Sequence, residues 1–199
     1  MKTKQTYVTL ISTDDFTIGA VMLYLFLKKV KTKYPFLVLC GDKVSNKSIK
    51  ILDKYNIQYK KLSEHMNVNT SDINKDAYHA RWSNTFDKLL IWTLTEFDKI
   101  VYLDCDMQVI KNLDYLFDSP HMSAVIADQW NEPGLDKPEN VSPVSVIHYM
   151  GARKPWMVSM VAALRRTKRN FLGKELLKYL LCLYVQFPTC LLPKKLRKL

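Results

Sequence analysis

Apolar residues fall into two kinds of pattern along the first half of the chain. Short, continuous apolar runs are typical of buried strands, and stretches with apolar side chains three or four positions apart are typical of helices. Thr13, Asp14, Asp15 and Ser45 lie where helices are expected to begin, and their side chains are suited to capping. The pattern predicts strands at residues 7–11, 36–39, 57–62 and 100–103, and helices over residues 16–30, around Ile49 and Leu52, and across Phe86, Leu89, Leu90, Leu94 and Phe97.

This alternation of strands and helices predicts an α/β fold with an open, mostly parallel, Rossmann-like sheet. Ligands of such sheets bind beyond the carboxyl ends of the strands. We therefore expect the chemistry to lie just after Ile11, Leu39 and Leu103. One domain is predicted over residues 1–156, and residues 157–199 are predicted to form a basic, partly apolar, helical tail.

The formal net charge of +11 is distributed unevenly along the chain. Acidic and basic side chains balance up to Gly151, and the excess lies beyond it, where Glu175 is the sole acid. The balanced body has no basic stripe interleaved with aromatic residues, which argues against nucleic-acid binding. In the tail, the basic cluster at residues 165–169 precedes several leucines, so it forms either a solvated face or a basic amphipathic helix on anionic lipid.

The apolar stretch at residues 176–192 permits three interpretations. Lys178 and Pro188 interrupt it, and it is short for a bilayer span, so a packed helix is favoured over interfacial attachment and over a transmembrane helix. The four cysteines have no framework spacing, which favours free thiols in a reducing compartment. The polar start of the chain lacks the apolar core of a signal peptide. Together these features predict a cytoplasmic protein, with peripheral membrane association through the tail as an alternative.

Two acids follow the fourth predicted strand directly, in the sequence Asp104-Cys105-Asp106. In extended backbone, residues two apart project to the same side, so both carboxylates can reach one cation. Carboxylate oxygens suit Mg²⁺ or Mn²⁺ bound to phosphates. Taken without its neighbours, such a pair is more readily explained by two acids that end a strand in a turn.

The neighbouring sequence changes that interpretation. Residues 81–89, Arg-Trp-Ser-Asn-Thr-Phe-Asp-Lys-Leu, precede the acids, and residues 108–117 follow them. A second motif at residues 148–156 reads His-Tyr-Met-Gly-Ala-Arg-Lys-Pro-Trp. Together these segments resemble the donor-binding core and the H-x-x-G-x-x-K-P-W element of the glycogenin and galactinol synthase family of glycosyltransferases.

The resemblance implies an enzyme that moves a hexosyl group, with retention, from a UDP-sugar to a hydroxyl acceptor on a sugar, lipid or protein. It implies that Asp104, Asp106 and His148 hold Mn²⁺, or Mg²⁺, on the donor diphosphate. The resemblance assigns no catalytic residue. It places the donor nucleotide and its diphosphate among Leu10, Ser12, Thr13, Phe16, Arg81, Lys88, Cys105, Gly151 and Lys154.

The sequence also departs from the family between its two motifs. The F-N-S-G strand and the D-Q helix start, which help to form the acceptor and sugar pocket in the family, are not recognisable between Asp106 and His148. This departure supports an alternative, a catalytically impaired derivative that binds a donor or a partner. A phosphatase with an aspartyl nucleophile is a weaker alternative, because that motif needs Thr or Val where Gln108 stands.

Overall fold

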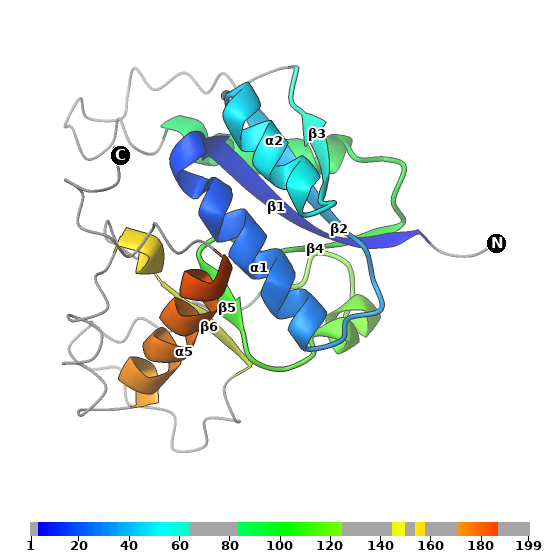
Figure 1. Cartoon of the computed structure of the whole chain (residues 1–199). Coiled ribbons are helices and arrows are strands. Elements are labelled where there is room, and N and C mark those ends of the chain that lie inside the picture. Colours follow the sequence, from blue (N-terminus) through cyan, green and yellow to red (C-terminus); the bar gives the residue numbers. More distant parts are fainter. Residues whose placement is uncertain (1–3, 64–82, 125–144, 150–153, 158–170, 187–199) are drawn as a thin grey trace, which may run out of the picture.

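A parallel sheet forms the centre of the computed structural model, which describes residues 4–63, 83–124, 145–149, 154–157 and 171–186. The four strands run in the order β3-β2-β1-β4, with every pair of neighbours parallel (Figure 1). This order confirms the predicted open α/β sheet. The strands are β1 (Gln5–Thr13), β2 (Phe36–Lys43), β3 (Gln58–Lys61) and β4 (Lys99–Tyr102).

The two faces of β1 lie in two separate apolar clusters. Successive side chains on a strand point to opposite faces, so Tyr7 and Ile11 enter the larger cluster while Val8 and Leu10 enter the smaller. The register with β2, which pairs Leu10 with Leu39, keeps like faces together. A continuous apolar run is thus buried on both sides, as expected for a central parallel strand.

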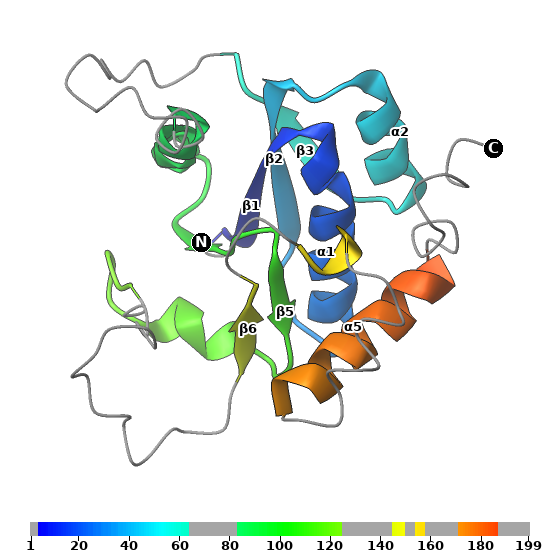
Figure 2. The same ribbon diagram turned by 90° about the vertical axis from the view of Figure 1, so that its left-hand side faces the viewer.

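Helices cover both faces of this sheet. The helices α1 (Thr17–Lys29) and α2 (Asn46–Lys54) lie on one face, and the 3₁₀ helix η2 (Ser83–Thr93) lies on the other (Figure 2). Side chains of α1 fill the larger cluster, and Leu94, just after η2, packs into the smaller one. Helices therefore lie over both faces of the sheet, and the predicted chemistry lies at the strand ends.

The helix predicted across residues 86–97 is present, but its predicted period was wrong. As a 3₁₀ helix, η2 repeats every three residues, so Asp87 and Leu90 are both buried while Leu89 is 47% exposed. A 3.6-residue period would place Leu89 on the buried face. The segment is also shorter than predicted, because regular helix ends at Thr93.

The predicted caps of the first two helices were also wrong in detail. Thr13 and Ser45 occupy the N-cap positions of η1 (Asp14–Phe16) and α2, but neither side chain makes a capping hydrogen bond. Instead, the Asp14 carboxylate accepts hydrogen bonds from the Ser45 backbone N–H at 2.8 Å and the Ser48 hydroxyl at 2.6 Å. These bonds hold the pKa of Asp14 below its ordinary value and place a negative charge at the start of α2, where the helix dipole favours it.

A second, two-stranded sheet packs against α1. The strands β5 (Met107–Val109) and β6 (Val146–His148) pair antiparallel, with Met107 opposite His148. The short helices η3 (Asp114–Asp118) and η4 (Pro155–Met157) follow them in the chain. This small sheet brings the segment of the second motif beside the end of β4.

The tail contributes one helix, α5 (Phe171–Gln186), to the larger cluster. Leu176, Tyr179, Leu180 and Leu183 are buried there, and burying each leucine contributes about 1.5–3 kcal/mol. Among the three interpretations of this apolar stretch, the structure therefore shows the packed helix. Among the described residues, no helix combines the length and apolarity that crossing a bilayer requires. The basic cluster at residues 165–169 lies outside the described residues, and the domain boundary at residue 156 stays a prediction.

One carboxylate connects three segments at the far end of this core. Asp114 accepts hydrogen bonds from the hydroxyls of Tyr7 at 2.9 Å and Thr32 at 2.5 Å, and from the Lys33 backbone N–H at 3.0 Å. Burial alone raises the pKa of Asp114, but the bonds from Thr32, Lys33 and Tyr7 outweigh it, and the net pKa is below the ordinary value. The folded state therefore favours the charged carboxylate.

We expect Asp114→Asn to lower the free energy of unfolding by about 1–3 kcal/mol near neutral pH, because the fully buried Tyr7 loses a charged acceptor. The contribution of a carboxyl whose folded pKa is depressed is present above its unfolded pKa of about 3.9 and is lost as pH falls through the folded pKa. The difference between wild type and variant in urea denaturation should therefore shrink as the pH falls below about 3.9. Exposed Asp118, changed to Asn, is the control, and an equal loss there would contradict the assignment.

Candidate metal and nucleotide site

The two acids that follow β4 lie in a turn. The strand β4 ends at Tyr102, and the backbone N–H of Met107 donates to the carbonyl of Asp104 at 3.1 Å, which closes the turn and starts β5. The predicted extended backbone was therefore wrong at this point. The turn still directs the carboxylates of Asp104 and Asp106 to one place, and it points the side chain of Cys105 into the core.

Cys105 is buried by this turn. Burial raises the pKa of its thiol well above the ordinary value, and the neighbouring carboxylates of Asp106 and Asp104 raise it further. Cys105 therefore stays a neutral thiol. Its side chain packs in the larger apolar cluster.

His148 reaches the acids from the second motif through β6. The backbone N–H of Tyr149 donates to the carbonyl of Asp106 at 3.1 Å, which fixes the end of β6 beside the turn. The Nε2 atom of His148 then lies 3.1 Å from Asp106 Oδ1 and 3.6 Å from Asp104 Oδ2. The short connection between the motifs is thus compatible with bringing the histidine to both acids.

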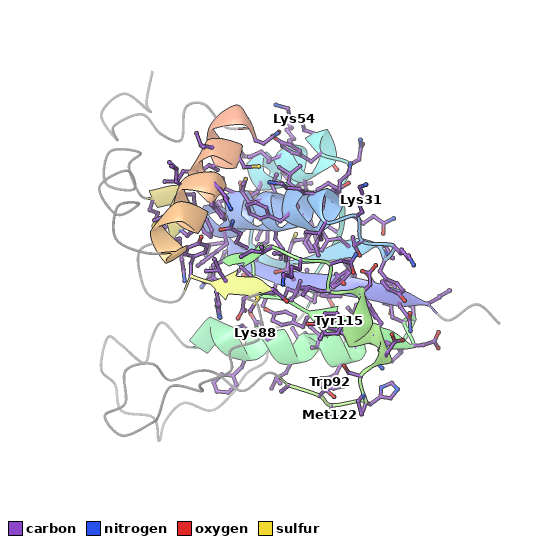
Figure 3. All side chains as sticks on the ribbon, turned by 90° about the horizontal axis from the view of Figure 1, so that it is seen from below. Lys31, Lys54, Lys88, Trp92, Tyr115 and Met122 are labelled. Carbon is purple, nitrogen blue, oxygen red and sulfur yellow. The ribbon has the colours of Figure 1, made fainter. Side chains whose placement is uncertain are left out.

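Two lysines bind the oxygens that face away from His148. Lys88, from η2, lies with its Nζ 2.7 Å from Asp104 Oδ1, and Lys154, just before η4, lies 2.5 Å from Asp106 Oδ2. Figure 3 shows Lys88 on the side of η2 that faces the sheet, with Trp92 on the solvent side of the same helix. Each carboxylate therefore has one oxygen held by an ammonium group and one oxygen turned toward the imidazole.

A tyrosine hydroxyl completes the orientation of Asp104. Tyr102 donates from its hydroxyl to Asp104 Oδ1 at 3.1 Å, and the ammonium group of Lys88 lies 5.7 Å from the centre of its ring. Burial and the nearby acid Asp104 raise the pKa of this hydroxyl far above its ordinary value, so it remains a donor. Sequence reasoning missed Tyr102, because a tyrosine in an apolar strand gives no signal of its own.

The three atoms that face one another form a ligand set suited to a divalent metal. One ligand atom each from Asp104, Asp106 and His148 lie within 4.8 Å of one another. Two carboxylate oxygens and one imidazole nitrogen suit Mn²⁺, which accepts nitrogen as well as oxygen ligands. The hydrogen bonds from His148 and Lys154 outweigh the effect of burial and keep the pKa of Asp106 below its ordinary value, so this carboxylate is charged and able to bind.

The other predicted binding residues lie on or just after β1, or outside the described residues. Ser12 and Thr13 are half-buried at the end of β1, and Phe16 packs edge-on against Trp156, with ring centres 6.3 Å apart. Leu10 packs in the smaller apolar cluster. The two remaining residues, Arg81 and Gly151, lie outside the described residues.

Comparison with known proteins identifies the family of the chain. The model of glycosyl transferase family 8 matches residues 7–133, which is more than half of the chain. The chain belongs to glycosyl transferase family 8. This confirms the resemblance noted in the sequence, and the matched range contains the acids and Lys88 but ends before His148 and Lys154.

Curated relatives in this family are longer than the chain. Galactinol synthase 1 of Solanum lycopersicum is 31% identical over 157 residues, which cover 74% of this chain and 49% of that protein. UDP-glucuronate:xylan alpha-glucuronosyltransferase 2 of Arabidopsis thaliana is 29% identical over 128 residues, 64% of this chain and 20% of that protein. The chain thus spans half or less of the length of these two relatives.

Among solved structures, the galactosyltransferase LgtC in complex with donor and acceptor sugar analogues has a TM-score of 0.46 and 18% sequence identity. The match covers 58% of this chain and 42% of that one. A likeness at this level carries no argument about the site. The fold assignment rests instead on the order and direction of the four strands.

The contact between Tyr102 and Asp104 generates a first test of the site. Tyr102→Phe removes one hydrogen bond to the carboxylate without changing the ring, which is worth about 0.5–1.5 kcal/mol, or about 2- to 12-fold in Mn²⁺ affinity. An electron paramagnetic resonance titration measures free Mn²⁺ directly. Tyr59→Phe, on β3, is the matched control and should leave the affinity unchanged. Equal affinities for Tyr102→Phe and wild type would show that this hydroxyl does not orient the acid.

Proposed function

We propose that this chain binds a UDP-sugar with a divalent metal at Asp104, Asp106 and His148, and that it transfers the hexosyl group to a hydroxyl acceptor. One observation carries the proposal: ligand atoms from two motifs far apart in the sequence lie within 4.8 Å of one another. A pair of acids at a strand end is common, whereas a convergent imidazole from a second family motif is not expected by chance. Retention of configuration is proposed from the family resemblance.

The charge balance of the cluster supports a nucleoside diphosphate as the ligand. Lys88 and Lys154 match the charges of Asp104 and Asp106, so the cluster is close to neutral when His148 is neutral. A divalent cation alone would leave a positive excess in a partly buried site, which is costly. A diphosphate supplies the missing negative charge. Metal and nucleotide should therefore bind much more tightly together than either does alone.

The same side chains provide the chemistry that glycosyl transfer needs. A nucleoside diphosphate leaves readily only when its growing negative charge meets fixed cations. Lys154, with a side chain 14% exposed, and Lys88 are held in place by the two acids, so little rearrangement is needed to meet that charge. When bound, a divalent metal supplies Lewis-acid stabilisation of the phosphate oxygens. His148, Asp104 and Asp106 would hold it there.

A second candidate is a derivative that keeps donor binding but does not transfer. The specific observation in its favour is the short segment between Asp106 and His148, in which the family's F-N-S-G and D-Q elements are not recognisable. Positioning of sugar and acceptor supplies much of a transferase's rate. Donor turnover separates the two candidates.

Calorimetric titration of UDP tests the first half of the proposal. We expect UDP to bind with Mn²⁺ present and to bind at least about tenfold more weakly without it. The reason is that the side chains of the cluster are together close to neutral, so the charge of the diphosphate is compensated only when the metal ion is also bound. Hydrolysis of a UDP-sugar, followed in the same sample, shows whether the chain is active. Binding with hydrolysis supports the transferase, and binding without hydrolysis supports the derivative. Absence of UDP binding in both conditions would contradict the proposal.

Asp104→Asn tests the assignment of the metal ligands. Loss of one charged ligand should weaken Mn²⁺-dependent UDP binding by about tenfold or more, because the mutation of residues that only hydrogen-bond to a metal ligand already lowers metal affinity by about tenfold or more. Asp118→Asn, which removes an exposed acid on η3, is the matched control. If Asp104→Asn binds UDP with Mn²⁺ as well as Asp118→Asn does, the metal lies elsewhere.

A further inference from the structure

Gly19, in the first turn of α1, lies closer to two neighbours than any side chain permits. A Cβ atom at this position would lie 2.6 Å from Trp156 Cη2, 2.9 Å from Trp156 Cζ3 and 2.7 Å from the carbonyl oxygen of Cys105. At Gly41, by contrast, the nearest atom would lie 3.4 Å away, which is an ordinary van der Waals distance. Glycine at position 19 is therefore required by close contact.

The two neighbours of Gly19 belong to the two halves of the candidate site. Cys105 is the middle residue of the turn that carries Asp104 and Asp106. Trp156 lies in η4, two residues after Lys154, and the N–H of Met157 donates to the Lys154 carbonyl at 2.9 Å, which closes this short turn. A single position on α1 thus contacts both turns between which the Asp106–Lys154 ion pair forms.

Packing alone fixes Trp156. Its ring is buried with 4% of the residue exposed, and within the described part of the chain its indole N–H has no hydrogen-bond partner. The ring touches Phe16 edge-on at 6.3 Å between centres, and it rests on α1 at Gly19. Because the described residues hold the ring by packing, we expect a displacement of the ring at Gly19 to move η4 and Lys154 with it.

We propose that Gly19 is a positioning residue for donor binding. By letting α1 approach Trp156 and the Cys105 carbonyl, it sets the distance between the turn of the two acids and the turn of Lys154. Glycine in a helix is less stable than alanine by about 0.5–1 kcal/mol, so alanine would be favoured here if no contact required glycine. The inference rests on the proposed function, because donor affinity is the property that Gly19 would control.

The direct test is Gly19→Ala in the full chain, with UDP affinity measured calorimetrically at saturating Mn²⁺, well below the melting temperature of the variant. We expect the affinity to fall by about tenfold or more, since the added methyl group must displace Trp156 or the Cys105 backbone. Lys50→Ala, at an exposed position on α2, introduces alanine into a helix away from these contacts and is the control. Circular dichroism confirms that each variant is folded.

A rescue variant separates positioning from general destabilisation. Gly19→Ala combined with Trp156→Phe shortens the ring that the new methyl group would meet but leaves the contact with the Cys105 carbonyl, so it should recover part of the lost UDP affinity even if its melting temperature stays low. A loss that the double variant does not recover would contradict the route through Trp156. Wild-type affinity in folded Gly19→Ala would overturn the inference while leaving the proposed function intact.

Two further outcomes are distinguishable. If wild-type chain itself does not bind UDP with Mn²⁺, the proposed function fails before the role of Gly19 is addressed. If Gly19→Ala does not fold, Trp156→Leu takes its place, because it removes the same contact from the other side. Weakened UDP binding in folded Trp156→Leu supports the inference, and unchanged binding overturns it.

Discussion

The carboxylates of Asp104 and Asp106 meet the imidazole of His148 at a partly buried turn. This arrangement depends on neutralising the negative charges of the two carboxylates. Asp104 and Asp106 would repel each other strongly if both were charged and unpaired in such a place. Lys88 and Lys154 neutralise them from the outside, at 2.7 and 2.5 Å, and so leave one oxygen of each acid facing His148. The two ion pairs thus stabilise the turn, and they also select the oxygens that remain available for a ligand.

The rest of the fold serves to bring these five side chains together. The two acids follow β4 of the central parallel sheet, and η2, which lies on one face of that sheet, carries Lys88. The small β5–β6 sheet brings His148 back to the turn. Packing of η4 against α1 at Gly19 brings Lys154 to Asp106. The helix α5, from the basic tail, completes the core beneath the small sheet, where the rings of Tyr179 and Tyr149 lie 5.6 Å apart.

The sequence was sufficient to predict the four strands of the central sheet and their parallel arrangement, and the family resemblance predicted the convergence of the two motifs. The strands β5 and β6 were not predicted. A short, continuous apolar run such as residues 36–39 is typical of a strand that is buried on both faces. The two motifs are recognised by the spacing of their residues within each motif. Details that depend on contacts between distant residues were not predictable. The 3₁₀ period of η2, the use of Asp14 in place of the Ser45 side chain at α2, and the turn at Asp104 all arise from tertiary packing. For the same reason Tyr102 and Gly19 gave no signal, since only their neighbours in space make them important.

The central claim is that His148 and the two acids bind one metal ion together with the donor nucleotide. Pulsed electron paramagnetic resonance of the Mn²⁺–UDP complex, with the chain labelled with ¹⁵N at histidine, tests it directly. A ¹⁵N coupling to Mn²⁺ that disappears in His148→Ala is the predicted result, because His148 Nε2 is the nitrogen that lies within reach of both acids. A Mn²⁺–UDP complex without histidine coupling, or with a coupling that persists in His148→Ala, would contradict the account.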